Sequence, residues 1–288
     1  MYKWHQRVEN GRLSIGDLNF MLSIAKESEQ ELNTLQPSEI KIDKKLFILL
    51  HGAWHANWCW NRVTPLLEKQ GHTVISPNLP GHGDDKIPFT DITLNSYVDS
   101  IIRIIESKKV PVVLVGHSMS GVVISQVAEK VPEKISHLVY VSAFIPDFEG
   151  SLIQEASQNK QSSMGKEMVI SEKENEIALK LSPLIKSYFY NTCEEQDALW
   201  ALSNLQKQPL RPFMDTVKLS SDRFGKIPKL YIECLRDQAI PIEEQRRMHG
   251  KLFCKVVSLD TDHSPFLSEP FKLAEMVSDG VVSDGVKS

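Results

Sequence analysis

The chain has 288 residues, and its 33 Lys and Arg against 37 Asp and Glu give a formal net charge of −4. This length suits one large domain or two small ones, and a composition of 41% hydrophobic and 24% charged residues excludes a disordered or fibrous protein. A slightly acidic chain without runs of like charge is also a poor match for nucleic acid or an anionic membrane.

The N-terminal region and the cysteines indicate in which cellular compartment the protein is expected. Residues 1–10 are rich in polar and charged side chains and have no apolar stretch typical of a secretory signal. No run of about 18 apolar residues, the length that a membrane span needs, occurs anywhere. The four cysteines form no C-x-x-C pair, so we expect them to be reduced and buried. These features predict a cytoplasmic protein.

The predicted elements alternate between strands and helices. Residues 1–45 are polar and irregular, and we interpret them as an N-terminal appendage. After it we expect strands at 46–50, 73–76, 111–115 and 135–144, and helices at about 60–69, after Thr93 and at 119–130. Strands at 229–233 and 255–259, a helix between them and another ending near Val277 complete the pattern. This alternation predicts an α/β fold with a mostly parallel sheet flanked by helices, and ligands at the carboxyl ends of its strands.

The alternation breaks between residues 147 and 225. No comparable apolar strand is visible there, and 172–184 and 194–205 read as helices. We therefore predict an α/β core formed by 46–146 and 226–288, with a helical cap at 147–225 over its active edge.

The strongest chemical signal is Gly116-His117-Ser118-Met119-Ser120-Gly121, which lies between an apolar strand and a helix. A sharp strand-to-helix turn at this place presents a serine hydroxyl at the helix N-terminus, which is the nucleophile elbow of serine hydrolases. Ser120 departs from the usual pattern, in which a glycine follows the serine by two positions. Serine is small enough for us to expect the packing to survive with slight strain.

A serine nucleophile needs a base and a group that orients the base. His263 follows the last predicted strand and is the candidate base, and Asp237 follows the preceding strand and is the candidate acid. Asp262 is expected to point away from the base, and Asp147 is a weaker substitute for Asp237. Three further histidines lie in other loops near the site and are expected to brace them by hydrogen bonds: His51, His82 and His117.

The oxyanion of acyl transfer needs two N–H donors. We assign the amide of Met119 and, in the loop after the first strand, the amide of Ala53. Trp54 is expected to face the substrate, whereas Trp58 and Trp60 are expected to pack under the first helix. Aromatic and methionine side chains of the cap could line a pocket, with Trp200 as the candidate substrate contact, although helix packing explains most of them equally well: Tyr188, Phe189, Tyr190, Trp200, Phe213 and Met214.

Over residues 46–278 the chain resembles the α/β-hydrolases that include plant methylesterases, hydroxynitrile lyases and bacterial pyrethroid-hydrolase-like carboxylesterases. The resemblance rests on His51-Gly52-Ala53-Trp54-His55, the 116–121 elbow, Arg223-Phe224-Gly225, the segment from Tyr231 to Asp237, Ile240-Pro241 and Asp262-His263. The order Ser118, Asp237, His263 is also that of this fold. Lyase members carry Thr and Lys where this chain has Gly52 and Ser264, and plant methylesterases carry Cys where it has Trp54.

The resemblance implies a serine carboxylesterase for small to medium apolar esters, of methylesterase type, without metal or organic cofactor. Two alternatives stay open: a lyase or other non-hydrolytic activity on the same triad, and a small-molecule receptor with vestigial hydrolysis. The expected partner is a small-molecule ester, with neither nucleic acid nor a membrane span. The sequence leaves a homodimer open.

Overall fold

The computed structural model describes residues 44–158, 162–180 and 182–282. The appendage predicted for residues 1–45 lies outside them, apart from its last two residues. Within the described ranges no helix is both long and apolar enough to cross a membrane.

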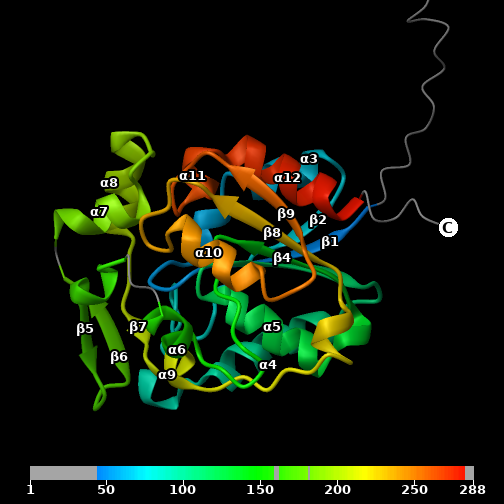
Figure 1. The fold of residues 1–288 in the computed structure, drawn as a ribbon, viewed down its shortest axis with the longest axis horizontal. Helices are drawn as coiled ribbons and strands as arrows, with labels where there is room; N and C mark the ends of the chain where they lie inside the picture. Colours follow the sequence, from blue (N-terminus) through cyan, green and yellow to red (C-terminus); the bar gives the residue numbers. More distant parts are fainter. Residues whose placement is uncertain (1–43, 159–161, 181, 283–288) are drawn as a thin grey trace, which may run out of the picture. The chain divides into compact units, whose positions relative to one another are not determined.

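The core of the described chain is a single sheet of six parallel strands (Figure 1). In spatial order these are β2 (Thr73–Ile75), β1 (Leu46–Leu50), β3 (Val112–His117), β4 (Ile135–Val141), β8 (Lys229–Cys234) and β9 (Lys255–Leu259). Every residue of β1, β3 and β8 is buried. Central strands of a parallel sheet are covered on both faces, which is why their sequences are nearly continuous apolar runs. The predicted α/β fold with a mostly parallel sheet is confirmed.

Helices cover both faces of this sheet. On one face α4 (Leu94–Glu106) packs against α5 (Ser120–Lys130), and on the other α3 (Thr64–Lys69) packs against α12 (Pro270–Val282). Two further helices and four 3₁₀ turns complete the core: α10 (Ile242–His249), α11 (Pro265–Ser268), η1 (Asn57–Trp60), η2 (Phe89–Asp91), η3 (Pro132–Lys134) and η5 (Phe224–Lys226). The helix expected at 60–69 begins only at Thr64, because Pro65 in its first turn favours a helix start there.

The segment 147–225 is less helical than its sequence indicated. It holds α6 (Leu152–Ser157), η4 (Met164–Glu167), α7 (Pro183–Phe189), α8 (Glu195–Ser203) and α9 (Arg211–Met214). It also holds a three-stranded antiparallel sheet of β5 (Met168–Ser171), β6 (Glu176–Leu179) and β7 (Gln208–Pro209), which Figure 1 shows beside α7 and α8.

The helix predicted over 172–184 is wrong, whereas the one predicted at 194–205 is present as α8. Asn175 adopts a left-handed conformation with φ 51° in the turn between β5 and β6. Asparagine tolerates that conformation well, so this segment forms a hairpin. The next helix, α7, starts only after Ser182, whose side chain accepts a hydrogen bond from the amide of Leu184.

The parallel strands bring the predicted site residues to one edge of the sheet. Ala53, Ser118, Asp237 and His263 all follow the carboxyl ends of strands, namely β1, β3, β8 and β9. The four cysteines are free thiols, of which Cys59 and Cys234 are buried and the other two are half-buried.

Candidate active site

Ser118 occupies the tight turn that joins β3 to α5. Its φ of 54° is unfavourable for a residue with a side chain and is typical of a nucleophile elbow. The turn needs small neighbours: a Cβ on Gly121 would lie 2.2 Å from the carbonyl oxygen of Phe144, and one on Gly52 would lie 2.9 Å from Cβ of Ser118. Ser120, which departs from the usual glycine, is buried and donates its hydroxyl hydrogen bond to the carbonyl of His51.

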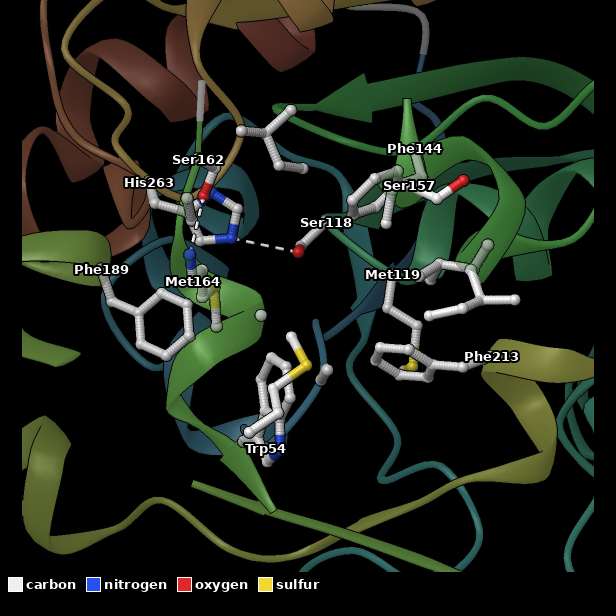
Figure 2. A pocket seen from close by; sticks show the side chains of 18 residues that line it. Trp54, Ser118, Met119, Phe144, Ser157, Ser162, Met164, Phe189, Phe213 and His263 are labelled. Atoms are coloured by element: carbon white, nitrogen blue, oxygen red, sulfur yellow. Dashed lines mark hydrogen bonds between the residues drawn. The ribbon is translucent and has the colours of Figure 1, made fainter. Parts of the chain in front are cut away.

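The three residues of the predicted triad form one chain of hydrogen bonds. Oγ of Ser118 lies 3.0 Å from Nε2 of His263, and Nδ1 of the same ring lies 2.6 Å from Oδ2 of Asp237. All three side chains are buried. Figure 2 shows the hydroxyl of Ser118 and the ring of His263 facing each other at the cavity. With Nδ1 donating to a carboxylate, Nε2 is left as the acceptor for the serine proton.

Four hydrogen bonds hold the Asp237 carboxylate. Oδ1 accepts from the amides of Ala239 at 2.7 Å and Ile240 at 2.8 Å. Oδ2 accepts from His263 and from the hydroxyl of Ser142, a buried residue just after β4. Sequence reasoning missed Ser142, because its contact with Asp237 spans 95 residues and depends on the neighbouring positions of β4 and β8.

The other two acidic candidates are engaged elsewhere. Asp147 is paired at the surface with Lys251, at 2.7 Å, and this ion pair lowers the pKa of the carboxyl. Asp262 points away from the ring of His263 and accepts hydrogen bonds from the amides of Thr192 and Ser264.

The two assigned oxyanion donors both border the cavity. Ala53 follows β1, and Met119 follows the nucleophile at the start of α5. Among the hydrogen bonds of the described residues, none is donated by either amide. Within the described part of the chain, neither N–H group is therefore engaged by another acceptor.

Buried histidines brace the loops around the triad, as expected. His51 bonds to the backbone of Gly52 and Leu79, and Nε2 of His117 donates to the carbonyl of His263 at 2.7 Å. His82 lies beside Gln208 of β7, with 3.0 Å between Nε2 and Oε1. Burial lowers the pKa of all three rings, because the charged form cannot be hydrated. They are neutral structural groups at physiological pH.

A cavity of about 300 Å³ opens over Ser118 and His263. Apart from these two, its described lining is almost wholly apolar, and the only other hydroxyls are those of Ser157 and Ser162. The rest of the lining is Ala53, Trp54, Met119, Phe144, Leu152, Ile153, Ala156, Met164, Gly165, Met168, Phe189, Phe213, Ala239 and Ile240. Several of these residues come from α6, η4 and β5. These elements reach the cavity only through the folding of 147–225, and no pattern in the sequence predicted that they would line it.

Two tryptophans that the sequence singled out have different positions. Trp54 does line the cavity, where its ring lies near those of Phe189 and Phe213 (Figure 2) and its Nε1 donates to the carbonyl of Ile177. Trp200 does not: it lies on the exposed side of α8, is 44% exposed and packs edge-on against Trp58. The expectation that Trp200 contacts substrate is therefore wrong, because helix α8 directs its ring toward η1 rather than into the cavity.

The remaining aromatic and methionine candidates of 147–225 also differ in position. Phe189 and Phe213 line the cavity, whereas Tyr190 is buried behind it and Met214 is half exposed. In the described part of the chain, no three His, Cys, Asp or Glu side chains are grouped to hold a metal ion.

The chain is similar to known proteins in both sequence and fold. Residues 47–276 match the alpha/beta hydrolase family. The chain is 33% identical to methylesterase 1 of Arabidopsis thaliana over 249 residues, which cover 81% of this chain and 94% of that relative. A pyrethroid hydrolase from Sphingobium faniae superposes with a TM-score of 0.73 at 26% identity, over 84% of this chain and 98% of the other. Polyneuridine aldehyde esterase superposes equally well, with 26% identity over 82% and 98% of the two chains.

Proposed function

Because the chain belongs to the alpha/beta hydrolase family, we propose that it is a serine carboxylesterase for small to medium, largely apolar esters, acting through an acyl-enzyme. The observation that supports this most is the hydrogen-bonded chain from Ser118 through His263 to Asp237, placed at a cavity without charged side chains in its described lining.

In the first half of the reaction, Oγ of Ser118 attacks the ester carbonyl carbon while Nε2 of His263 takes the hydroxyl proton. A bond forms between Oγ and the acyl carbon, and the negative charge moves to the carbonyl oxygen. Asp237 stabilises the imidazolium and keeps its Nδ1 protonated. The ester C–O bond then breaks, and His263 returns the proton to the departing alcohol.

In the second half, water takes the place of the alcohol. His263 removes a proton from the water, the resulting hydroxide attacks the acyl carbon, and the bond to Oγ breaks as the proton returns to Ser118. In both halves the amides of Ala53 and Met119 bind the oxyanion. Removal of one such donor costs about 10²–10³ in kcat in a well-studied protease.

The cavity supports the substrate class. Its volume of about 300 Å³ lies at the lower end of the range for small-molecule sites, roughly 300–1,000 Å³, so bulky esters would not be enclosed. A free carboxylate or phosphate on the substrate would find no cation in the described lining and would be desolvated without compensation. Neutral acyl and alcohol groups are therefore favoured.

The rival activities differ from hydrolysis at definite positions. In lyase members a lysine follows the catalytic histidine, whereas Ser264 stands here, fully buried and outside the cavity lining. A receptor with vestigial hydrolysis would bind esters and turn them over only very slowly. A burst of p-nitrophenol from p-nitrophenyl acetate followed by steady turnover would exclude that alternative.

The test is a panel of neutral and charged esters with product identification, run on the wild type and on Ser118→Ala. We expect the substitution to lower kcat on the order of 10⁴-fold or more, because triad residues act as a unit. Ser125→Ala is the matched control: this serine is also buried, but its hydroxyl bonds to Gly121 and Tyr140, outside the cavity. Activity of Ser118→Ala within about tenfold of that of the control would refute the proposal.

A further inference from the structure

The loop that carries Ala53 has an unusual set of hydrogen bonds. Each of its four successive carbonyls accepts one: that of His51 from the Ser120 hydroxyl, that of Gly52 from Nδ1 of His51 at 2.8 Å, and that of Ala53 from Nδ1 of His55 at 2.7 Å. The carbonyl of Trp54 accepts from the amide of Gln206 at 2.8 Å. The four successive carbonyls from His51 to Trp54 are therefore each held by a hydrogen bond.

The bond from His51 acts on the peptide unit that contains the oxyanion donor. The carbonyl of Gly52 and the N–H of Ala53 belong to the same planar trans peptide and point in opposite directions. A donor that holds this carbonyl consequently sets the direction of the N–H. It also polarises the peptide, which makes the N–H a better donor.

The protonation of His51 is determined by its surroundings. The amide of Leu79 lies 3.1 Å from Nε2 and can only donate, so Nε2 carries no proton. The ring is fully buried, which lowers its pKa well below the usual value and keeps it neutral. Its single ring proton is thus on Nδ1, where it bonds to the carbonyl of Gly52.

His55 repeats this arrangement one peptide further along. Its Nδ1 donates to the carbonyl of Ala53, and its Nε2 accepts from the hydroxyl of Tyr190, which comes from the segment between α7 and α8. Burial lowers the pKa of His55 to about 3, so this ring is neutral as well. The two carbonyls on either side of the Ala53 amide are both held by histidines.

We propose that His51 is a positioning residue that directs the Ala53 amide at the oxyanion, with His55 and Tyr190 supporting the next peptide. The inference rests on the proposed function, since it concerns the stabilisation of that reaction's transition state. His51 does not itself touch the substrate.

Two substitutions at one position separate positioning from packing. The amide nitrogen of an asparagine lies close to where Nδ1 of histidine was, so His51→Asn keeps a donor for Gly52. The side-chain amide of a glutamine lies near the place of Nε2, so His51→Gln keeps an acceptor for Leu79 but loses that donor. We expect His51→Asn to keep kcat within about fivefold, and His51→Gln to lose roughly 10- to 100-fold in kcat with KM within about threefold.

A trifluoromethyl ketone inhibitor gives a second readout, because its adduct with Ser118 carries an oxyanion. Its affinity should fall in the same order as kcat. Melting temperatures of both variants are measured in parallel. Equal losses in the two variants, or a larger loss in His51→Asn, would overturn the inference while leaving the proposed function intact.

Tyr190→Phe is a second test of the proposal, and it is the one that applies if His51→Gln does not fold. It removes only the hydroxyl that bonds to His55, and Tyr140→Phe is its control, since that buried hydroxyl bonds to Ser125 instead. We expect kcat on p-nitrophenyl acetate to fall about 3- to 10-fold in Tyr190→Phe relative to the control. Equal kcat in the two would overturn the inference, and no ester turnover by the wild type would refute it together with the proposed function.

Discussion

Replacing Asp237 with asparagine tests the proposed catalytic triad at the residue whose hydrogen bonds most restrict the outcome. The amides of Ala239 and Ile240 both donate to Oδ1, so an asparagine there must keep its carbonyl oxygen on that side. The reverse orientation would leave two buried donors facing an NH₂ group, at about 1–3 kcal/mol each. The NH₂ of the asparagine therefore faces Nδ1 of His263.

Two donors cannot share one hydrogen bond, so His263 would move its proton from Nδ1 to Nε2. A protonated Nε2 cannot accept the proton of Ser118, and the nucleophile loses its base. The same change in a serine protease lowers kcat by roughly 10⁴-fold, and we expect a loss of that size here.

The assay is steady-state hydrolysis of p-nitrophenyl acetate, with near-ultraviolet circular dichroism to confirm folding. Asp147→Asn is the control for an exposed carboxylate paired with Lys251, and Asp262→Asn is the control for a buried one. Both controls should retain kcat within about tenfold. If either lost as much activity as Asp237→Asn, the assignment of the acid would be wrong.

Three further outcomes are expected. Gly121→Ala should lower the free energy of unfolding, measured by denaturant titration, by about 3 kcal/mol, because the new Cβ would lie 2.2 Å from a carbonyl oxygen. Gly165→Ala is the control, since no atom lies within 4 Å of its new Cβ. Trp200→Ala should leave the ranking of acyl chain lengths by kcat/KM unchanged, since this ring lies outside the cavity; an altered ranking would contradict that placement. Because burial lowers the pKa of His55 to about 3, the unfolded chain binds a proton there below about pH 6.5 that the folded chain does not. The contribution of the neutral His55 ring to stability is complete above pH 6.5 and is lost as the pH falls toward 3, by up to about 1.4 kcal/mol per pH unit. Calorimetry should therefore show a lower Tm at pH 5.5 than at pH 7.5. An equal Tm at the two pH values would argue against a neutral buried ring.

Local patterns in the sequence were enough to predict the parallel core. Apolar runs such as 46–50 and 111–115 are continuous because those strands are covered on both faces, and Thr93 marked the start of α4 through a side-chain cap. Ser118, Asp237 and His263 each follow a strand of the parallel sheet, which predicted that they would meet, since parallel strands end at one edge.

The tertiary structure alone decided what surrounds these residues. The hairpin at Asn175, the exposed position of Trp200 and the role of Ser142 depend on contacts between segments far apart in the sequence, and no local pattern encodes such contacts. The same holds for the bond from Tyr190 to His55, which spans 135 residues. Residue types and their order therefore determined the chemistry available to this chain, whereas the packing of 147–225 on the core decided the shape of the cavity and the hydrogen bond that supports His55.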